Sequence, residues 1–169
     1  DTGSNGEILL DNMEKLGLDP RSIDIVVISH IHGDHVGGLT SVLEKNPNVT
    51  VYVPSSFPQR YIDMLREKGA KVVLVHDPII IVEGVMSTGE IKASFDLYEQ
   101  SLVINTTKGL VILSGCAHPG IDHIVEKTIE ILGYDKIFLV GGGFHLTGVS
   151  DSRILEIIEV FKKHGIEYV

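Results

Sequence analysis

The feature that most constrains this chain is a short run of metal-ligand residues placed directly after an apolar stretch. Residues 25–28 are all β-branched, which is typical of a buried strand. His30, His32, Asp34 and His35 follow at once. Residues two apart at the end of a strand point to the same side, so His30 and His32 can reach one ion. Zinc accepts imidazole nitrogen and carboxylate oxygen, so the stretch predicts a metal site, and its two ligand pairs suggest two ions.

The glycines near these histidines are a second indication of a metal site. Gly33 is expected to let the chain turn sharply between the two ligand pairs, which would swing Asp34 and His35 round towards the metal. The alternative is a set of histidines scattered on a solvated loop. That alternative does not explain why the histidines alternate at a strand end with Gly37 and Gly38 beside them, so we favour the metal site.

Short β-branched runs alternate with amphipathic stretches along the chain, which is typical of the α/β class. The expected strands are residues 25–28, 49–53, 71–75, 79–82, 101–106, 110–113 and 136–140, and the expected helices are residues 7–16, 39–45, 59–68, 121–132 and 152–163. Gly109 suits a hairpin turn, so the strands on either side of it should be antiparallel. A chain of 169 residues that is 43% hydrophobic can bury a core as a single domain over residues 1–169.

Further chemically active side chains come where predicted strands end. Cys116 and His118 follow the strand at 110–113, and His145 follows the strand at 136–140. Strand-end loops of open α/β folds gather at one rim, so we expect these segments to meet the metal-ligand stretch. We interpret Cys116 as a small residue packed under the loop that carries His118, and not as a nucleophile.

A resemblance to the metallo-β-lactamase superfamily follows from the pattern Ser29-His30-x-His32-x-Asp34-His35-x-Gly37-Gly38. Asp1-Thr2-Gly3 resembles the turn that precedes the ligand loop in that superfamily, and Gly115-Cys116-Ala117-His118 resembles its later segment with a third histidine. Residues 115–120 together with Gly142-Gly143-Phe144-His145-Leu146 are similar to the branch of dihydropterin ribofuranosylaminobenzene phosphate synthases. The resemblance implies an αββα sandwich that binds one or two metals at the edge of its two sheets.

The resemblance also implies a ligand set and a cofactor. His30, His32 and His118 would hold the first ion, and Asp34 with His35 would hold the second. Zinc is the expected metal, as two ions in the complete protein, with iron or manganese as alternatives. Asp34 is also a candidate catalytic acid or base, but a carboxylate committed to a metal keeps little basicity, so coordination is its first expected role.

His145 is the second catalytic candidate, and its role stays open. The superfamily usually supplies a bridging aspartate from the corresponding region, whereas this chain has Gly142-Gly143-Phe144-His145 there. His145 is therefore expected to bind metal, to contact the substrate or to orient its loop. Asp1 is expected to accept a hydrogen bond that orients the loop carrying His30, His32 and His35.

Both ends of the chain are expected to be incomplete. The chain begins at Asp1, where the superfamily has already formed several strands, and residues 166–169 are predicted as a strand entering the sheet. In the resembled branch a further histidine follows that strand and completes the second metal site. No histidine follows His164 here, so the sequence is expected to be a fragment of a larger protein.

Charge and composition exclude several other classes. The net charge is −9, with 14 Lys and Arg against 23 Asp and Glu, which argues against a general nucleic-acid binder. One cysteine cannot form an internal disulfide. No apolar stretch approaches the roughly 18 residues of a membrane span, so we expect a cytoplasmic protein with no membrane partner.

The expected function is that of a metal-dependent hydrolase or transferase acting on a small, phosphorylated molecule. In a hydrolase the metals would activate water against an ester, lactam or phosphoester. In the synthase branch they would bind the pyrophosphate of a dihydropterin. Two alternatives stay open. A diiron oxygen or nitric oxide reductase is one, although such relatives carry glutamate where His32 stands. The other is an incomplete metal-binding fragment without turnover.

Overall fold

The structure is a computed structural model that describes residues 1–94, 96–134 and 136–169. The chain forms two compact units, Asp1–His76 (unit 1) and Asp77–Val169 (unit 2). The expectation of a single domain over residues 1–169 stays a prediction.

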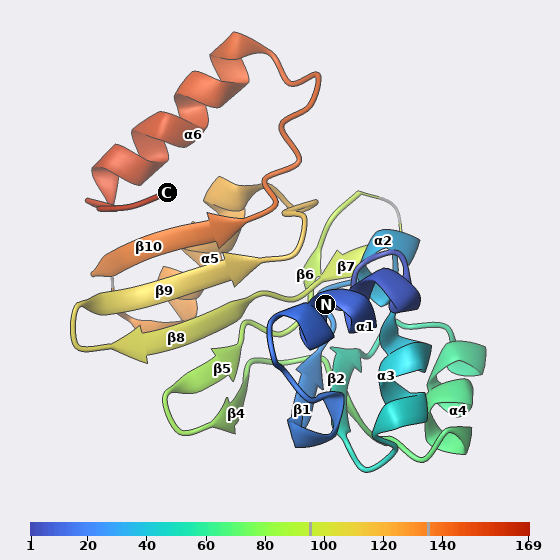
Figure 1. The fold of residues 1–169 in the computed structure, drawn as a ribbon. Helices are drawn as coiled ribbons and strands as arrows, with labels where there is room; N and C mark the ends of the chain where they lie inside the picture. Colours follow the sequence, from blue (N-terminus) through green and yellow to red (C-terminus); the bar gives the residue numbers. More distant parts are fainter. Residues whose placement is uncertain (95, 135) are drawn as a thin grey trace. The chain divides into compact units, whose positions relative to one another are not determined.

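Unit 1, all of whose residues are described, is built on a parallel sheet in the order β1-β2-β3 (Figure 1). Helices α3 and α4 stand between successive strands in the sequence, as the crossovers of parallel pairing require. The strands are β1 (Ile25–Val27), β2 (Thr50–Pro54) and β3 (Lys71–Val75), and the helices are α1 (Gly6–Lys15), α2 (Gly33–Val36), α3 (Leu39–Lys45) and α4 (Gln59–Glu67), with a 3-10 helix at Pro20–Ser22.

The core of unit 1 is formed by the sheet and its helices. Val51 and Val53 of β2 are fully buried and alternate with a less buried neighbour, as expected for a strand with one face towards the core. Leu65 of α4 is also fully buried and belongs to the same apolar cluster. The backbone N–H of Ile28 donates to the carbonyl of Tyr52 at 2.9 Å, which extends the pairing of β1 by one residue. The metal-ligand stretch therefore begins directly after a residue whose backbone is hydrogen-bonded to the sheet.

Among the described residues of unit 2, five strands form a mixed sheet in the order β10-β9-β8-β5-β4, and β6 pairs with β7 (Figure 1). β8 and β9 are antiparallel, whereas β9 and β10 are parallel, so the two last strands end at the same edge of the sheet. The strands are β4 (Ile79–Val82), β5 (Val85–Ser87), β6 (Ile91–Lys92), β7 (Tyr98–Glu99), β8 (Leu102–Thr106), β9 (Gly109–Ser114) and β10 (Ile137–Gly142), and the helices are α5 (Ile121–Leu132) and α6 (Asp151–Lys163).

The core of unit 2 joins both helices to this sheet. Ile112 of β9, Val140 of β10 and Ile124 of α5 are each 0% exposed, and they share one apolar cluster with Phe161 of α6. Burying a side chain of this size contributes about 1.5–3 kcal/mol. The cluster therefore holds β9 and β10 in register and fixes the starting points of the loops that follow them.

The structure confirms the predicted α/β class and most of the predicted elements. The helices expected at 39–45 and 121–132 have those bounds, and the strands that flank Gly109 pair antiparallel. β5, β6 and β7 were not predicted, because strands of two or three residues are too short to show an alternation. The expected strand at 166–169 is reduced to one parallel bridge between Leu139 and Tyr168. Across the described residues, no helix combines the length and the apolar character needed to cross a membrane.

Candidate metal centre

The histidine loop of unit 1, defined as residues 29–36, starts at the end of β1 and finishes in the single helical turn α2. His32 has extended backbone angles, φ −64° and ψ 145°, and precedes that turn. Gly33 is the first helical residue and is not among the residues with a positive φ. The expectation of a sharp turn made by a flexible glycine is therefore wrong. The helical turn itself redirects the chain and carries Asp34 and His35.

Three imidazole rings gather in the histidine loop. The ring centroids of His30 and His32 are 4.7 Å apart, and those of His30 and His35 are 4.1 Å apart. A ring nitrogen of His30 lies within 4.8 Å of one of His32 and of one of His35. His30 is fully buried, whereas His32 is exposed. The structure thus brings together the three histidines that the strand-end spacing singles out.

Hydrogen bonds around Asp1 determine which nitrogen carries the proton in two of these rings. The Asp1 carboxylate accepts the backbone N–H of Ser29 at 2.6 Å and its hydroxyl at 2.7 Å, and it lies 2.7 Å from His35 Nδ1. Ser29 Oγ in turn lies 2.9 Å from His30 Nδ1. Because a carboxylate only accepts and the Ser29 hydroxyl gives its proton to it, both Nδ1 atoms act as donors. In the neutral rings, Nε2 of His30 and of His35 then holds the lone pair that a metal requires.

Asp34 supplies the carboxylate of the histidine loop. Its side chain is 68% exposed, and its Oδ2 lies 3.4 Å from His35 Nε2. A hydrogen bond from its own backbone N–H lowers the pKa of the Asp34 carboxyl below its ordinary value. The group is therefore ionised at neutral pH, and it presents an oxygen ligand close to an imidazole nitrogen.

A second group of ligand atoms, the unit 2 cluster, consists of Cys116, His118 and His145. One ligand atom from each residue lies within 4.8 Å of the other two. Cys116 Sγ is 3.3 Å from His145 Nδ1, and the ring centroids of His118 and His145 are 4.4 Å apart. The loops after β9 and β10 therefore lie together, whereas their expected meeting with the stretch of residues 30–35 stays a prediction. The interpretation of Cys116 as a packing residue is incomplete, since its half-buried side chain directs sulfur at an imidazole.

Glu99 of β7 holds the loop that carries this cluster, and the sequence patterns did not reveal it. Glu99 is 1% exposed. Its Oε1 accepts the backbone N–H groups of Cys116 at 2.8 Å and of Ala117 at 2.9 Å, and its Oε2 accepts that of His118 at 2.9 Å. A buried carboxylate needs such donors to offset its lost hydration. Glu99 stands three residues before the strand Leu102–Thr106, and nothing in the local sequence marks it as buried.

The backbone of the unit 2 cluster is strained at two residues. Among the described residues, Ala117 with φ 56° and His145 with φ 50° are the two with a positive φ that are not glycine. The left-handed region costs about 1–2 kcal/mol for such residues. Strain of this kind concentrates at functional sites, where the surrounding structure dictates the backbone. The placement of these ligand atoms is thus imposed by the packing around them.

A cavity of about 240 Å³ adjoins His118 and His145. Arg153 of α6 adds one cation to its wall, and the Arg153 guanidinium is 2.6 Å from the Asp122 carboxylate, which raises the pKa of Arg153. The rest of the wall is largely apolar and includes Phe144, Leu146, Val149 and Ile157. Such a cavity suits one end of a small molecule that carries both a ring and an anionic group.

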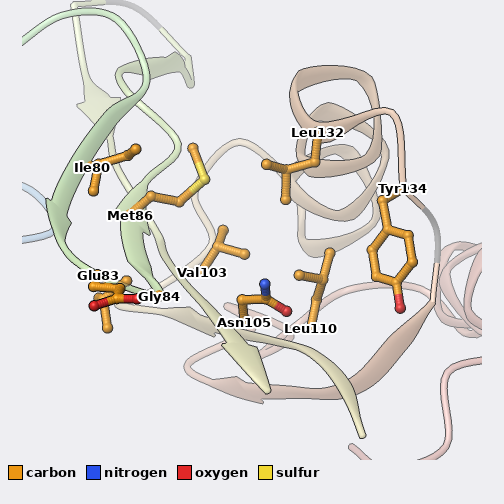
Figure 2. Close-up of a pocket in the computed structure, with 10 residues that line it drawn as sticks. Ile80, Glu83, Gly84, Met86, Val103, Asn105, Leu110, Leu132 and Tyr134 are labelled. Atoms are coloured by element: carbon orange, nitrogen blue, oxygen red, sulfur yellow. The ribbon is translucent and has the colours of Figure 1, made fainter. Parts of the chain in front are cut away.

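A larger pocket of about 610 Å³ lies elsewhere in unit 2, between the β4–β5 hairpin and the end of α5. Figure 2 shows Ile80 and Met86 facing Leu132 and Tyr134 across it. Its described lining residues include no histidine or cysteine.

The residues present fit a divalent metal. Unit 1 brings together three imidazoles and the Asp34 carboxylate, and unit 2 brings together two imidazoles and a thiol. These are the ligands that zinc and related transition metals prefer. Each predicted site residue therefore lies in one of the two clusters: His30, His32, Asp34 and His35 in unit 1, and His118 and His145 in unit 2.

Comparison with known sequences points to the same chemistry. The model of the family described as "Metallo-beta-lactamase superfamily" matches residues 1–109. The chain is 32% identical over 211 residues to 7,8-dihydropterin-6-methyl-4-(beta-D-ribofuranosyl)-aminobenzene-5'-phosphate synthase of Methanocaldococcus jannaschii. That similarity covers 100% of this chain and 72% of the synthase.

Solved structures agree with the sequence comparison. The chain is similar to Tm1679, a metal-dependent hydrolase of the beta-lactamase superfamily, with a TM-score of 0.77 and 26% identity over 98% of this chain and 73% of the other. A quorum-quenching N-acyl homoserine lactone lactonase shares the fold, with a TM-score of 0.56 and 18% identity over 100% of this chain and 71% of the other. The expected metallo-β-lactamase-like fold is thereby confirmed.

Proposed function

This chain belongs to the metallo-beta-lactamase superfamily, and from that premise we propose that it is a metal-dependent hydrolase or transferase acting on a small, phosphorylated molecule. The similarity to a synthase that is named after a 5'-phosphate compound supports a phosphorylated substrate. One structural observation carries the proposal. The hydrogen bonds of Asp1 and Ser29 leave Nε2 of both His30 and His35 ready to accept a metal ion.

The proposed metal ligands are His30, His32, Asp34 and His35 of unit 1 and His118 of unit 2. Imidazole nitrogens and a carboxylate oxygen suit zinc, and this number of ligands supports two ions, with iron or manganese as alternatives. A bound ion of this kind lowers the pKa of water and stabilises negative charge on a reacting ester or phosphoryl group.

The residues of the chain prepare that chemistry by orienting the ligands. Asp1 and Ser29 set the tautomer and orientation of two imidazoles, and Glu99 holds the backbone that carries His118. Asp34 acts first as a ligand, since coordination takes most of its basicity. These contacts reduce the reorganisation needed when metal and substrate bind.

The cavity beside His118 and His145 is the proposed place for one end of the substrate. Both histidines line it, so His145 lies next to any molecule that enters. An imidazole in this position suits metal binding, substrate contact or orientation of the loop, the three roles that the sequence leaves open for His145. Arg153 lines the same cavity and can attract a phosphate group, although its guanidinium also forms an ion pair with Asp122.

Metal content and turnover test the proposal together. The purified protein is expected to contain zinc, iron or manganese, and to hydrolyse members of a panel of phosphoesters and lactones. Chelation is expected to abolish that turnover, and addition of the metal to restore it. A protein that takes up no divalent ion and converts no member of the panel would contradict the proposal.

Asp34→Asn is expected to lower the affinity for a second metal ion, and any turnover, by about ten- to a hundredfold or more. The substitution keeps the shape of the side chain but removes one negative charge from a site proposed to hold two cations. Calorimetric titration with Zn²⁺ and the turnover number measure the two effects. Asp63→Asn, at an exposed acid of α4, is the matched control. Activity equal to that of the parent would remove Asp34 from the mechanism.

A further inference from the structure

We infer that Cys116 is a metal ligand, and that Cys116, His118 and His145 together hold a thiophilic divalent ion. The inference rests on the proposed function and deepens it, because it names the class of metal that the protein selects. The sequence comparisons and the fold do not assign Cys116 any role.

The distances within the cluster match a shared ion. In a tetrahedral zinc site with Zn–S of about 2.3 Å and Zn–N of about 2.0–2.1 Å, sulfur and nitrogen are about 3.5 Å apart. Cys116 Sγ and His145 Nδ1 are 3.3 Å apart. A ligand atom of His118 lies within 4.8 Å of both. A hydrogen bond between the Cys116 thiol and the His145 imidazole would by itself explain the distance of 3.3 Å. It would not explain why a ligand atom of His118 lies near both.

Two glycines allow the loops that carry these ligands to approach so closely. A Cβ on Gly142 would lie 2.0 Å from the carbonyl oxygen of Ser114, and a Cβ on Gly143 would lie 2.5 Å from that of Gly115 and 3.1 Å from Cys116 Cα. No side chain fits at either position without moving backbone. The loops after β9 and β10 are therefore packed backbone against backbone, which places Cys116 beside His145.

The Cys116 side of the cluster is also anchored before any metal binds. Glu99 accepts the backbone N–H groups of both Cys116 and His118, so one buried carboxylate holds the two ligand-bearing residues at a constant separation. A site whose ligands are held in this way loses little conformational entropy on binding an ion. The thiol proton would pass to solvent when the sulfur coordinates.

A sulfur ligand changes which metal the protein prefers. Thiolate is a soft ligand that favours zinc, iron and cobalt, whereas magnesium, calcium and manganese favour carboxylate and water. A purely histidine and carboxylate site discriminates less strongly between these groups. Coordination by Cys116 therefore predicts selectivity for Zn²⁺ over Mn²⁺ that depends on the sulfur.

Cobalt substitution tests the inference directly, because Cys116 is the single cysteine in the sequence. The Co²⁺-loaded protein, kept under reducing conditions, is expected to show a sulfur-to-cobalt charge-transfer band in the near ultraviolet. Cys116→Ser is expected to keep the visible d–d bands but to lose the charge-transfer band. The same variant is expected to lose at least about tenfold in Zn²⁺ affinity and much less in Mn²⁺ affinity. His123→Ala, at an exposed position of α5, is the control and should keep both sets of bands.

The possible outcomes separate this inference from the proposed function. Cobalt bound with d–d bands but without a charge-transfer band would overturn the role of Cys116 and leave the metal-dependent function intact. A parent chain that binds no cobalt would contradict the proposed function and this inference together. Unfolding of metal-free Cys116→Ser at the same temperature as the parent would show that the lost affinity does not come from misfolding.

Discussion

Replacing His30 and His32 together with alanine is expected to abolish metal binding by the protein. Both are proposed ligands of one ion, and their rings lie 4.7 Å apart at the end of a firmly held strand. Well-formed zinc sites bind with apparent free energies of about 10–16 kcal/mol, and the loss of two ligands removes most of that. Elemental analysis after dialysis is expected to find no metal above that of the buffer.

Two controls separate the loss of metal ligands from the loss of any two histidines and from loss of stability. His76→Ala with His123→Ala removes the same number of imidazoles from exposed positions outside both clusters and should leave metal content unchanged. His30 is fully buried, so its removal also lowers stability. His32→Ala alone, at an exposed position, avoids that effect and is expected to weaken Zn²⁺ binding at least about tenfold. Parental metal content in both the double and the single variant would contradict the ligand assignment.

Glu99→Ala is expected to cause the largest loss of stability of the variants considered for unit 2. The Glu99 carboxylate accepts three backbone N–H groups, and also the Ser114 hydroxyl at 3.2 Å. Alanine leaves these donors without that acceptor, and each buried donor without a partner costs about 1–3 kcal/mol. We expect the free energy of unfolding to fall by about 3–5 kcal/mol, measured by denaturant titration.

Glu99→Gln separates the positioning role of Glu99 from its contribution to stability. The glutamine keeps one oxygen acceptor but turns an N–H₂ group towards backbone donors, so stability should recover only in part. Zn²⁺ affinity should follow the same order, parent above Glu99→Gln above Glu99→Ala, because the loop carrying His118 is progressively released. Glu83→Ala, at an exposed acid of the β4–β5 turn, should change stability by no more than about 0.5 kcal/mol. Unchanged Zn²⁺ affinity in both Glu99 variants would reduce Glu99 to a purely structural role.

Local patterns were sufficient to predict most helices and strands. The helix at Ile121–Leu132 has apolar residues at helical spacing, and the hairpin at Gly109 has a turn residue between two β-branched runs. Both signals lie within a window of a few residues, so they do not depend on the rest of the fold. The short strand Tyr98–Glu99 has no such signal, because it forms only through pairing with Ile91–Lys92.

The candidate site also has a part that could be predicted from local sequence and a part that could not. The sequence was enough to predict that His30, His32, Asp34 and His35 lie together, because residues that follow a single strand end cannot move far apart. It also indicated that His118 and His145 would meet, since strand-end loops of open α/β folds gather at one rim, and the parallel pairing of β9 with β10 agrees with this. Two contacts depend on the tertiary fold: Glu99, rather than another acid, is buried under the loop that carries His118, and Cys116 faces His145. Those contacts join residues 17 and 29 positions apart. A carboxylate becomes buried only where a distant backbone supplies its hydrogen bonds, and no local pattern encodes where that backbone will be.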